Sequence, residues 1–428
     1  LDPREHVLMR PGMYIGSLDP DNMQTWIYEN KMLYKNIEYI SGLYKIYDEI
    51  IVNALDHVIR CQEEGKKVVK EIKVNIDKTT ETIEVYNSGE GIEIEVHKQH
   101  NVYIPELVFG NMLTSTNYND EEERIIGGQN GIGAKACNIY SKRFIVETVD
   151  SKKKKLYYQE FLNNMKDKSE PKISKFTTYP YTKITFTPDY DRFKQKGLSD
   201  DMYKLMVKRV YDICALTKNN IKVFLNNERI DYKNFEKYVD LYLGSCKTEN
   251  HRLHYEASNG RWEICLSGSD EGFRQVSFVN GINTLKGGKH VDYIVNQITK
   301  KLSELITKRR KVTVRPNIIK EHLFVLMKAT INNPTFDSQT KEFLTTPYSK
   351  FGSKCEIDDK FIEKLYKFDI TDKIVTISER DDNKNAKKTD GRKRSVIRGI
   401  LKLDDANWAG TSKSDECTLI LTEGDSAK

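Results

Sequence analysis

Residues 124–144 read RIIGGQNGIGAKACNIYSKRF, and four glycines fall within seven positions of this stretch. Glycine adopts backbone conformations with positive φ and lets main-chain amides come close to a ligand. The residues after Gly133 have a helix-like pattern, and a helix that begins beside such a turn directs its positive dipole end toward it. The stretch is therefore interpreted as a cradle for a phosphate group.

Several nucleotide folds use glycine turns, and the spacing separates them. A Walker-type loop requires Gly-Lys-Ser/Thr, whereas Ala134 stands between Gly133 and Lys135, so that interpretation fails. Residues 131–136 match a loose dinucleotide fingerprint with Asp150 as the later acid, but the charged segment before them is unlike a buried first strand. The lid of another nucleotide fold and a glycine turn without a ligand remain open.

The composition indicates a soluble, globular chain of two or three domains. Its 428 residues are too many for one core, and 38% hydrophobic with 31% charged residues exclude a disordered chain. The sequence has neither a membrane-length apolar run nor a signal-peptide core, so we expect an intracellular protein with no membrane contact. Seven cysteines without a C-x-x-C pair are typical of reduced thiols.

The net charge of +6 is modest, but basic residues cluster at 152–155, at 308–311 (KRRK) and at 384–394. Such clusters are commonly solvated loops, and they also fit a partner with a phosphate backbone. For the KRRK segment we expect weak, sequence-independent DNA binding that depends on salt.

A strong helix is predicted over residues 42–62. Its apolar side chains recur at three- and four-residue spacing and form one buried face. Glu49, Asn53 and Asp56 fall about one turn apart on another side. An acid and an amide on one line can orient a water molecule and ligate a hydrated magnesium ion, whereas an ordinary polar face is the alternative.

Two strands, over residues 70–76 and 82–86, are predicted next from their β-branched alternation. The second strand leads into NSGEG (87–91), a glycine turn that can expose the Asn87 side chain to a purine edge. A hydroxyl-rich loop, residues 113–118, then precedes the phosphate cradle.

The elements around these motifs are predicted from pattern alone. Proline and glycine indicate that residues 10–17 are a turn-rich arm. Residues 145–187 are expected to complete a sheet without contributing to a site. A helix over 202–216 and a strand over 221–225 end the first domain, and a second domain begins near residue 231.

The helix with Glu and Asn, the N-x-G-x-G turn, the hydroxyl loop and G-x-N-G-x-G-A resemble, in this order, the four boxes of the Bergerat-fold (GHKL) ATPases. This family includes type II DNA topoisomerases, MutL proteins, ninety-kilodalton heat-shock chaperones and histidine kinases. Residues 277–283 (SFVNGIN), 286–292 (KGGKHVD) and 333–342 (NPTFDSQTKE) resemble the transducer domain of eukaryotic-type type IIA topoisomerases, the last with its QTK loop. Residues 418–428 (TLILTEGDSAK) resemble the start of a Toprim metal domain.

The resemblance implies an α/β fold of the two-layer α+β kind. A strand at 276–279, a helix at 291–305 and the segment 321–329 fit the βαβ unit of a ribosomal-protein-like transducer. The implied domains are a GHKL ATP-binding sandwich (1–230), a transducer domain (231–380), and a basic linker with the start of a Toprim domain (381–428).

The resemblance also assigns the site. Glu49 is the implied general base, Asn53 the ligand of the ATP magnesium, and Glu423 the start of the Toprim magnesium site. Gln339 and Lys341 are implied to reach the γ-phosphate from the second domain. The other implied contacts are Asn87 at adenine; Ser115, Thr116 and Asn117 at the sugar and phosphates; Asn130, Gly131, Gly133, Ala134 and Lys135 at the triphosphate; and Asp56, Gly128, Gln129 and Ile132 among the further nucleotide-binding positions.

The implied function is the ATPase gate of a type IIA DNA topoisomerase, with ATP and Mg²⁺ as cofactors. ATP closes a homodimer, and one DNA duplex passes through a break made in another by parts of the enzyme outside this sequence. The expected location is the nucleus or cytoplasm, or a virion or viral factory. The alternatives are a nucleotide-switched clamp of the MutL or chaperone type and, more distantly, a dinucleotide oxidoreductase.

Overall fold

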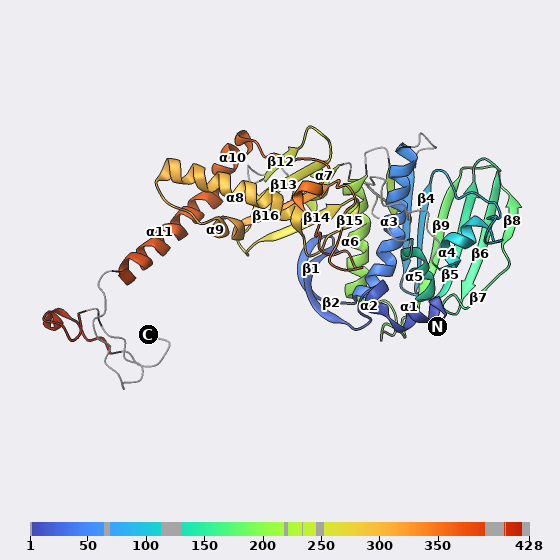
Figure 1. Cartoon of the computed structure of the whole chain (residues 1–428), viewed down its shortest axis with the longest axis horizontal. Helices are drawn as coiled ribbons and strands as arrows, with labels where there is room; N and C mark the ends of the chain where they lie inside the picture. The colour runs from blue at the N-terminus through green and yellow to red at the C-terminus, as the bar shows by residue number, and fades with distance from the viewer. Residues whose placement is uncertain are drawn as a thin grey trace.

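The computed structural model describes residues 2–63, 69–112, 131–217, 221–232, 234–244, 252–389, 406 and 408–421. These residues form two lobes side by side, and a long helix leads away from the second lobe (Figure 1).

The first lobe is built on a mixed sheet of nine strands among the described residues. Neighbouring strands are antiparallel except for one parallel pair. Alternate residues are buried along the central strands, as expected of a sheet with one face on a core. Across the sheet the strands are β11 (Glu228–Ile230), β10 (Lys222–Leu225), β3 (Glu71–Asp77), β4 (Thr82–Ser88), β9 (Tyr181–Pro188), β5 (Ser141–Asp150), β6 (Lys155–Leu162) and β7 (Asp167–Lys168), with β8 (Lys172–Lys175) also paired to β6.

Helices pack on this sheet and on one another. The predicted long helix is α3 (Ser41–Glu63), and its apolar stripe, from Leu43 to Val58, is buried in the core, which confirms the periodicity argument. Helices α4 (Ile104–Gly110), α5 (Gly133–Ile139) and α6 (Asp200–Leu216) also belong to this lobe.

The N-terminal segment differs from its prediction. Residues 10–17 are predicted to be a turn-rich arm, but residues 11–14 form a short helix, α2 (Pro11–Tyr14), which follows another short helix, α1 (Pro3–Met9). Proline is favoured at the first position of a helix, where its missing N–H is not needed, so Pro11 begins a helix. The hairpin of β1 (Asp21–Glu29) and β2 (Lys31–Tyr39) follows and leads into α3.

The second lobe contains a five-stranded sheet among the described residues. The predicted βαβ unit is confirmed, because β14 (Arg274–Val279) and β16 (Leu323–Ala329) pair in parallel and α8 (Lys289–Arg310) connects them. Strand β16 is buried on both faces, with helices on one side and α7 (Phe235–Leu243) on the other. The remaining elements are β12 (Arg252–Glu256), β13 (Trp262–Gly268), β15 (Ile282–Asn283), α9 (Pro316–Glu321), η1 (Tyr348–Lys350), α10 (Asp359–Tyr366), α11 (Asp369–Thr389) and η2 (Ser414–Glu416).

Within the described ranges, no helix has the length and apolar character needed to cross a membrane. Nor do these ranges hold a group of three or more His, Cys, Asp or Glu side chains arranged for a metal ion.

Candidate nucleotide-binding site

The polar line predicted on α3 lies beneath a loop of the second lobe. Glu49 and Asp56 are buried and Asn53 is half-buried. The three residues are spaced by four and three positions, so they share one side of the helix while the apolar stripe packs into the core. The line is therefore largely buried and is not a solvated helix face.

Two lysines hold the Glu49 carboxylate. Lys45, one turn earlier on α3, places its Nζ 2.5 Å from Oε1, and Lys341 Nζ from the second lobe lies 3.3 Å from the same oxygen. Burial opposes ionisation of Glu49, but Lys341 and Lys45 together outweigh it and lower its pKa to about 2. Burial lowers the pKa of Lys45, although the neighbouring Glu49 opposes that change. Glu49 is therefore an ionised carboxylate at neutral pH.

The glycine turn closes over the same carboxylate. A Cβ on Gly133 would lie 1.9 Å from Glu49 Oε2, so any larger residue there would displace the carboxylate. Gly131 has a φ of 60°, in the left-handed region that favours glycine. The turn thus brings its backbone against the side chain expected to orient the attacking water.

Lys135 and its neighbours pack at the start of α5. Lys135 is buried, its Nζ donates to the Gly131 carbonyl at 2.8 Å, and burial lowers its pKa to about 8. Ala134 is buried and Ile132 is half-buried. A buried ammonium group held at a glycine turn is suited to an anionic ligand, because such a ligand would offset its desolvation.

The QTK loop supplies the residue that reaches across the lobes. Lys341 is buried and Gln339, two residues earlier, is half-buried. Between them Thr340 packs on the N-terminal segment, since a Cβ on Gly16 would lie 2.7 Å from Thr340 Cγ2. The structure therefore brings Glu49 and Lys341 together from opposite ends of the sequence.

Asn87 lies near the end of β4 and is buried, with its Nδ2 donating to the Ser88 carbonyl at 3.3 Å. The acid required by the dinucleotide interpretation has another role. Asp150 accepts hydrogen bonds from the backbone N–H groups of Ile94, Lys152 and Lys153. Since the sheet is also mainly antiparallel, the dinucleotide-oxidoreductase alternative is wrong.

Some predicted site residues lie outside the described residues, and their placement stays a prediction. They are Ser115, Thr116, Asn117, Gly128, Gln129, Asn130 and Glu423.

The sequence argument missed a buried network that links α3 to the second lobe. Arg209 on α6 is fully buried, and its Nε donates to Asp48 Oδ1 at 2.6 Å. Its Nη2 donates to the carbonyl of Gly281 in the second lobe at 2.7 Å. No sequence signal joins these three residues, whereas Lys45 could have been found from its four-residue spacing to Glu49.

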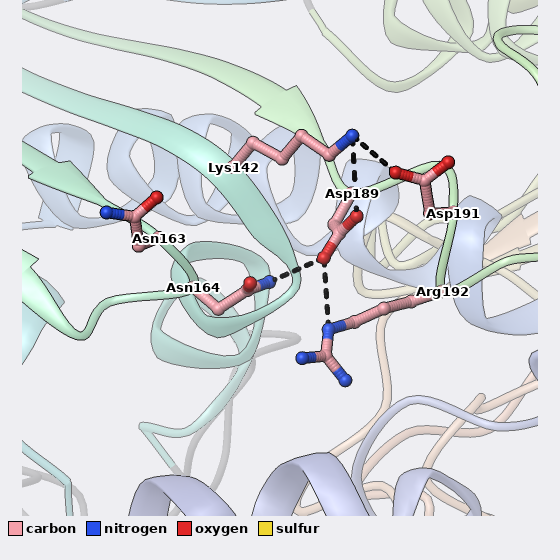
Figure 2. Close-up of a pocket in the computed structure, with 6 residues that line it drawn as sticks. All are labelled: Lys142, Asn163, Asn164, Asp189, Asp191 and Arg192. Carbon is pink, nitrogen blue, oxygen red and sulfur yellow. Dashed lines mark hydrogen bonds and ion pairs between the residues drawn. The ribbon is translucent and has the colours of Figure 1, made fainter.

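A surface pocket lies at the other end of α5 (Figure 2). In it Lys142 Nζ lies 2.6 Å from Asp191 Oδ2, and Arg192 Nε donates to Asp189 Oδ2 at 3.0 Å. Asn164 donates both to Asp189 and to the carbonyl of Ile139, the last residue of α5. The charged side chains that line this pocket are paired with one another, and none of the lining residues belongs to the predicted site.

Family models match both lobes. The family described as histidine kinase-, DNA gyrase B- and HSP90-like ATPase matches residues 38–190, and the DNA gyrase B family matches residues 221–394. DNA topoisomerase 2 of Pisum sativum is 45% identical over 431 residues, which is 99% of this chain and 29% of that protein. The crystal structure of the ATPase region of Saccharomyces cerevisiae topoisomerase II matches with a TM-score of 0.82 and 43% identity, covering 88% of this chain and 98% of that one.

The chain belongs to the DNA topoisomerase II family. A further topoisomerase II match is the crystal structure of the ATPase and transducer domains from Balamuthia mandrillaris, with a TM-score of 0.82, 39% identity, and coverage of 90% of this chain and 98% of that one. DNA topoisomerase 2 of Acanthamoeba polyphaga mimivirus is 45% identical over 436 residues, 99% of this chain and 34% of that protein. The chain spans about a third or less of these curated topoisomerase II relatives and corresponds to the ATPase region.

The family assignment decides between the two GHKL interpretations. MutL-type and chaperone-type clamps share the N-terminal boxes, whereas the DNA gyrase B match lies over the second lobe. The fold class implied by the resemblance, a GHKL sandwich followed by a transducer, is confirmed by the topoisomerase II structures.

Proposed function

We propose that this chain is the ATP-hydrolysing gate of a type IIA DNA topoisomerase. The observation that carries the proposal is the ion pair between Glu49 on α3 and Lys341 of the second lobe, 292 residues apart in the sequence. A lysine that reaches this carboxylate can also reach a phosphate held beside it. The matches to the ATPase family and to the yeast ATPase region support the proposal.

Hydrolysis of the terminal phosphate requires an oriented water and neutralisation of developing charge. Glu49 would orient and deprotonate the water, and Lys341 with Gln339 would contact the γ-phosphate. Transfer of Lys341 from Glu49 to that phosphate removes one of the two cations that lower the carboxylate pKa. Glu49 then becomes a stronger base only when the γ-phosphate is present.

The residues also fit a magnesium ion bound with the nucleotide. Asn53 is half-buried one turn from Glu49 and offers an amide oxygen, a ligand type that Mg²⁺ accepts alongside phosphates and water. Bound there, the ion would supply neutralisation of phosphate charge. Asn87 would contact the adenine, and Lys135 with the glycine turn would contact the phosphates.

The wider activity is part of the same proposal. Nucleotide binding would close a homodimer, and double-stranded DNA would pass through the enzyme to which this region belongs. The proposed domains remain 1–230, 231–380 and 381–428, with Glu423 in the Toprim site. Because the relatives are eukaryotic and viral, we propose a location in the nucleus or cytoplasm, or in a viral factory.

ATP turnover tests the central assignment. Glu49→Ala should lower turnover at least about 100-fold, because general-base catalysis is worth about 10²–10⁴-fold. Glu263→Gln is the control, since Glu263 is an ion-paired, half-buried glutamate, 2.6 Å from Lys328 Nζ, that lies away from the site. Wild-type turnover in Glu49→Ala would refute the base assignment.

A further inference from the structure

Glu342, the residue after Lys341, is held by both lobes. It is buried, and its Oε1 accepts a hydrogen bond of 2.9 Å from the hydroxyl of Tyr39, at the end of β2 in the first lobe. Its Oε2 lies 2.5 Å from Nζ of Lys286, which precedes α8 in the second lobe. Each carboxylate oxygen therefore has one partner, and the two partners come from different lobes.

The backbone around Glu342 is fixed as well. The Lys286 N–H donates to the Glu342 carbonyl at 2.9 Å, and the Leu344 N–H donates to the Gly287 carbonyl at 3.1 Å. A Cβ on Gly288 would lie 2.4 Å from Leu344 N, so the segments around residues 288 and 344 can approach this closely only with glycine at position 288. The segment after Lys341 is thus joined to the start of α8.

Lys341 itself has an unusual backbone. Its φ is 59°, in the left-handed region that residues with a Cβ rarely adopt. Such a conformation costs free energy and persists only where the surrounding contacts enforce it. The Lys341 N–H donates to the Ser338 carbonyl at 3.1 Å, and the contacts of Glu342, one residue later, fix the chain on the other side.

We propose that Glu342 is a positioning residue that, with Tyr39 and Lys286, holds Lys341 in the conformation that contacts the γ-phosphate. The proposal rests on the proposed function, because it assigns Lys341 to that phosphate. In this proposal Glu342 acts through the lysine beside it. Since Tyr39 belongs to the first lobe, the arrangement is complete only when the lobes are docked.

Nucleotide affinity tests the proposal without turnover. Calorimetry would compare the β,γ-imido analogue of ATP with ADP for wild type, Tyr39→Phe, Lys341→Ala and the double variant. Tyr39→Phe removes one hydroxyl and leaves Glu342 Oε1 buried without that donor, which should weaken analogue binding about tenfold. Affinity for ADP, which has no γ-phosphate, should change less than about twofold, and the double variant should bind the analogue no more weakly than Lys341→Ala.

The outcomes separate the two claims. Suppose that Lys341→Ala weakens binding of the analogue selectively. The positioning role is then overturned if Tyr39→Phe weakens binding of the analogue and of ADP alike. It is also overturned if Tyr39→Phe weakens analogue binding by the same factor in the wild type and in Lys341→Ala. If Lys341→Ala weakens neither nucleotide, the proposed function and the positioning role fail together. Lys286→Ala is a second variant in case Tyr39→Phe fails to fold, because the Lys286 side chain is 61% exposed and should behave as Tyr39→Phe does. Glu263→Gln is the control, and should leave both affinities unchanged.

Discussion

The Glu49 ion pairs predict how stability depends on pH. The pKa of Glu49 falls from its ordinary value of 4.5 to about 2 in the folded chain, with burial opposing and the two lysines favouring the ionised form. The ionised carboxylate therefore stabilises the fold fully above pH 4.5, and the contribution is lost as the pH falls through about 2. The difference in pKa corresponds to about 3 kcal/mol, to order of magnitude.

Glu49→Gln keeps the shape of the side chain and removes its titration. At pH 7 the variant should unfold with a free energy about 3 kcal/mol lower than wild type, and the difference should shrink as the pH is lowered from 4.5 toward 2. Lys45 limits this loss of stability. Burial already lowers the pKa of Lys45, so its ammonium group can lose a proton when the side chain at position 49 is neutral.

Urea unfolding followed by tryptophan fluorescence, repeated from pH 7 to pH 3, measures this difference. Glu304→Gln, on the exposed side of α8, is the control and should give a curve parallel to wild type. Parallel curves for Glu49→Gln as well would mean that the carboxylate is not held by Lys45 and Lys341, and the geometry of the site would be refuted.

Loss of one partner from the buried Asp48–Arg209 ion pair should destabilise the fold. In urea titrations Asp48→Asn should lower the free energy of unfolding by about 3–5 kcal/mol, whereas the double variant Asp48→Leu with Arg209→Met should recover most of that loss. In Gly133→Ala a methyl group would displace the Glu49 carboxylate, so ATP turnover should fall at least about tenfold while thermal unfolding shows a folded chain. Replacing the two lysines of the KRRK segment (308–311) should lower the slope of log DNA affinity against log salt by about 0.9 per lost phosphate contact; an unchanged slope in fluorescence anisotropy would exclude these lysines from DNA binding.

The long elements could be predicted because each carries its own local pattern. The stripe of α3 has the period of a helix, and β16 begins with five consecutive apolar residues, as expected of a parallel strand buried on both faces. The prediction for the N-terminal segment is wrong because proline can mark either the end of one helix or the start of the next. Pro11 is the first residue of α2.

Charge was the least informative property of the sequence. In the KRRK segment Arg309 is paired with Glu363 at 2.6 Å and Arg310 with Asp372 at 2.9 Å. Both acids lie more than fifty positions later, on α10 and α11, so a count of basic residues overstates the charge available to DNA.

The site could be predicted where its members share one helix or one turn. Contacts between the lobes could not, because Tyr39 and Glu342 are separated by 303 positions and nothing in either local pattern indicates the other. The resemblance placed Lys341 at the site, but the residues that hold it there became visible only with the lobes in place.

Two adjacent residues of α3 connect the helix to the second lobe in different ways. Asp48 holds Arg209, which donates to the Gly281 carbonyl. Glu49 instead pairs with Lys341, whose partner changes in the proposed mechanism when a γ-phosphate is present. A contact that persists beside one that exchanges partners would allow the second lobe to turn, so differential contact of Lys341 with the nucleotide would set the angle between the lobes. Weakening the Asp48–Arg209 contact should therefore uncouple hydrolysis from that motion without removing the residues that perform it.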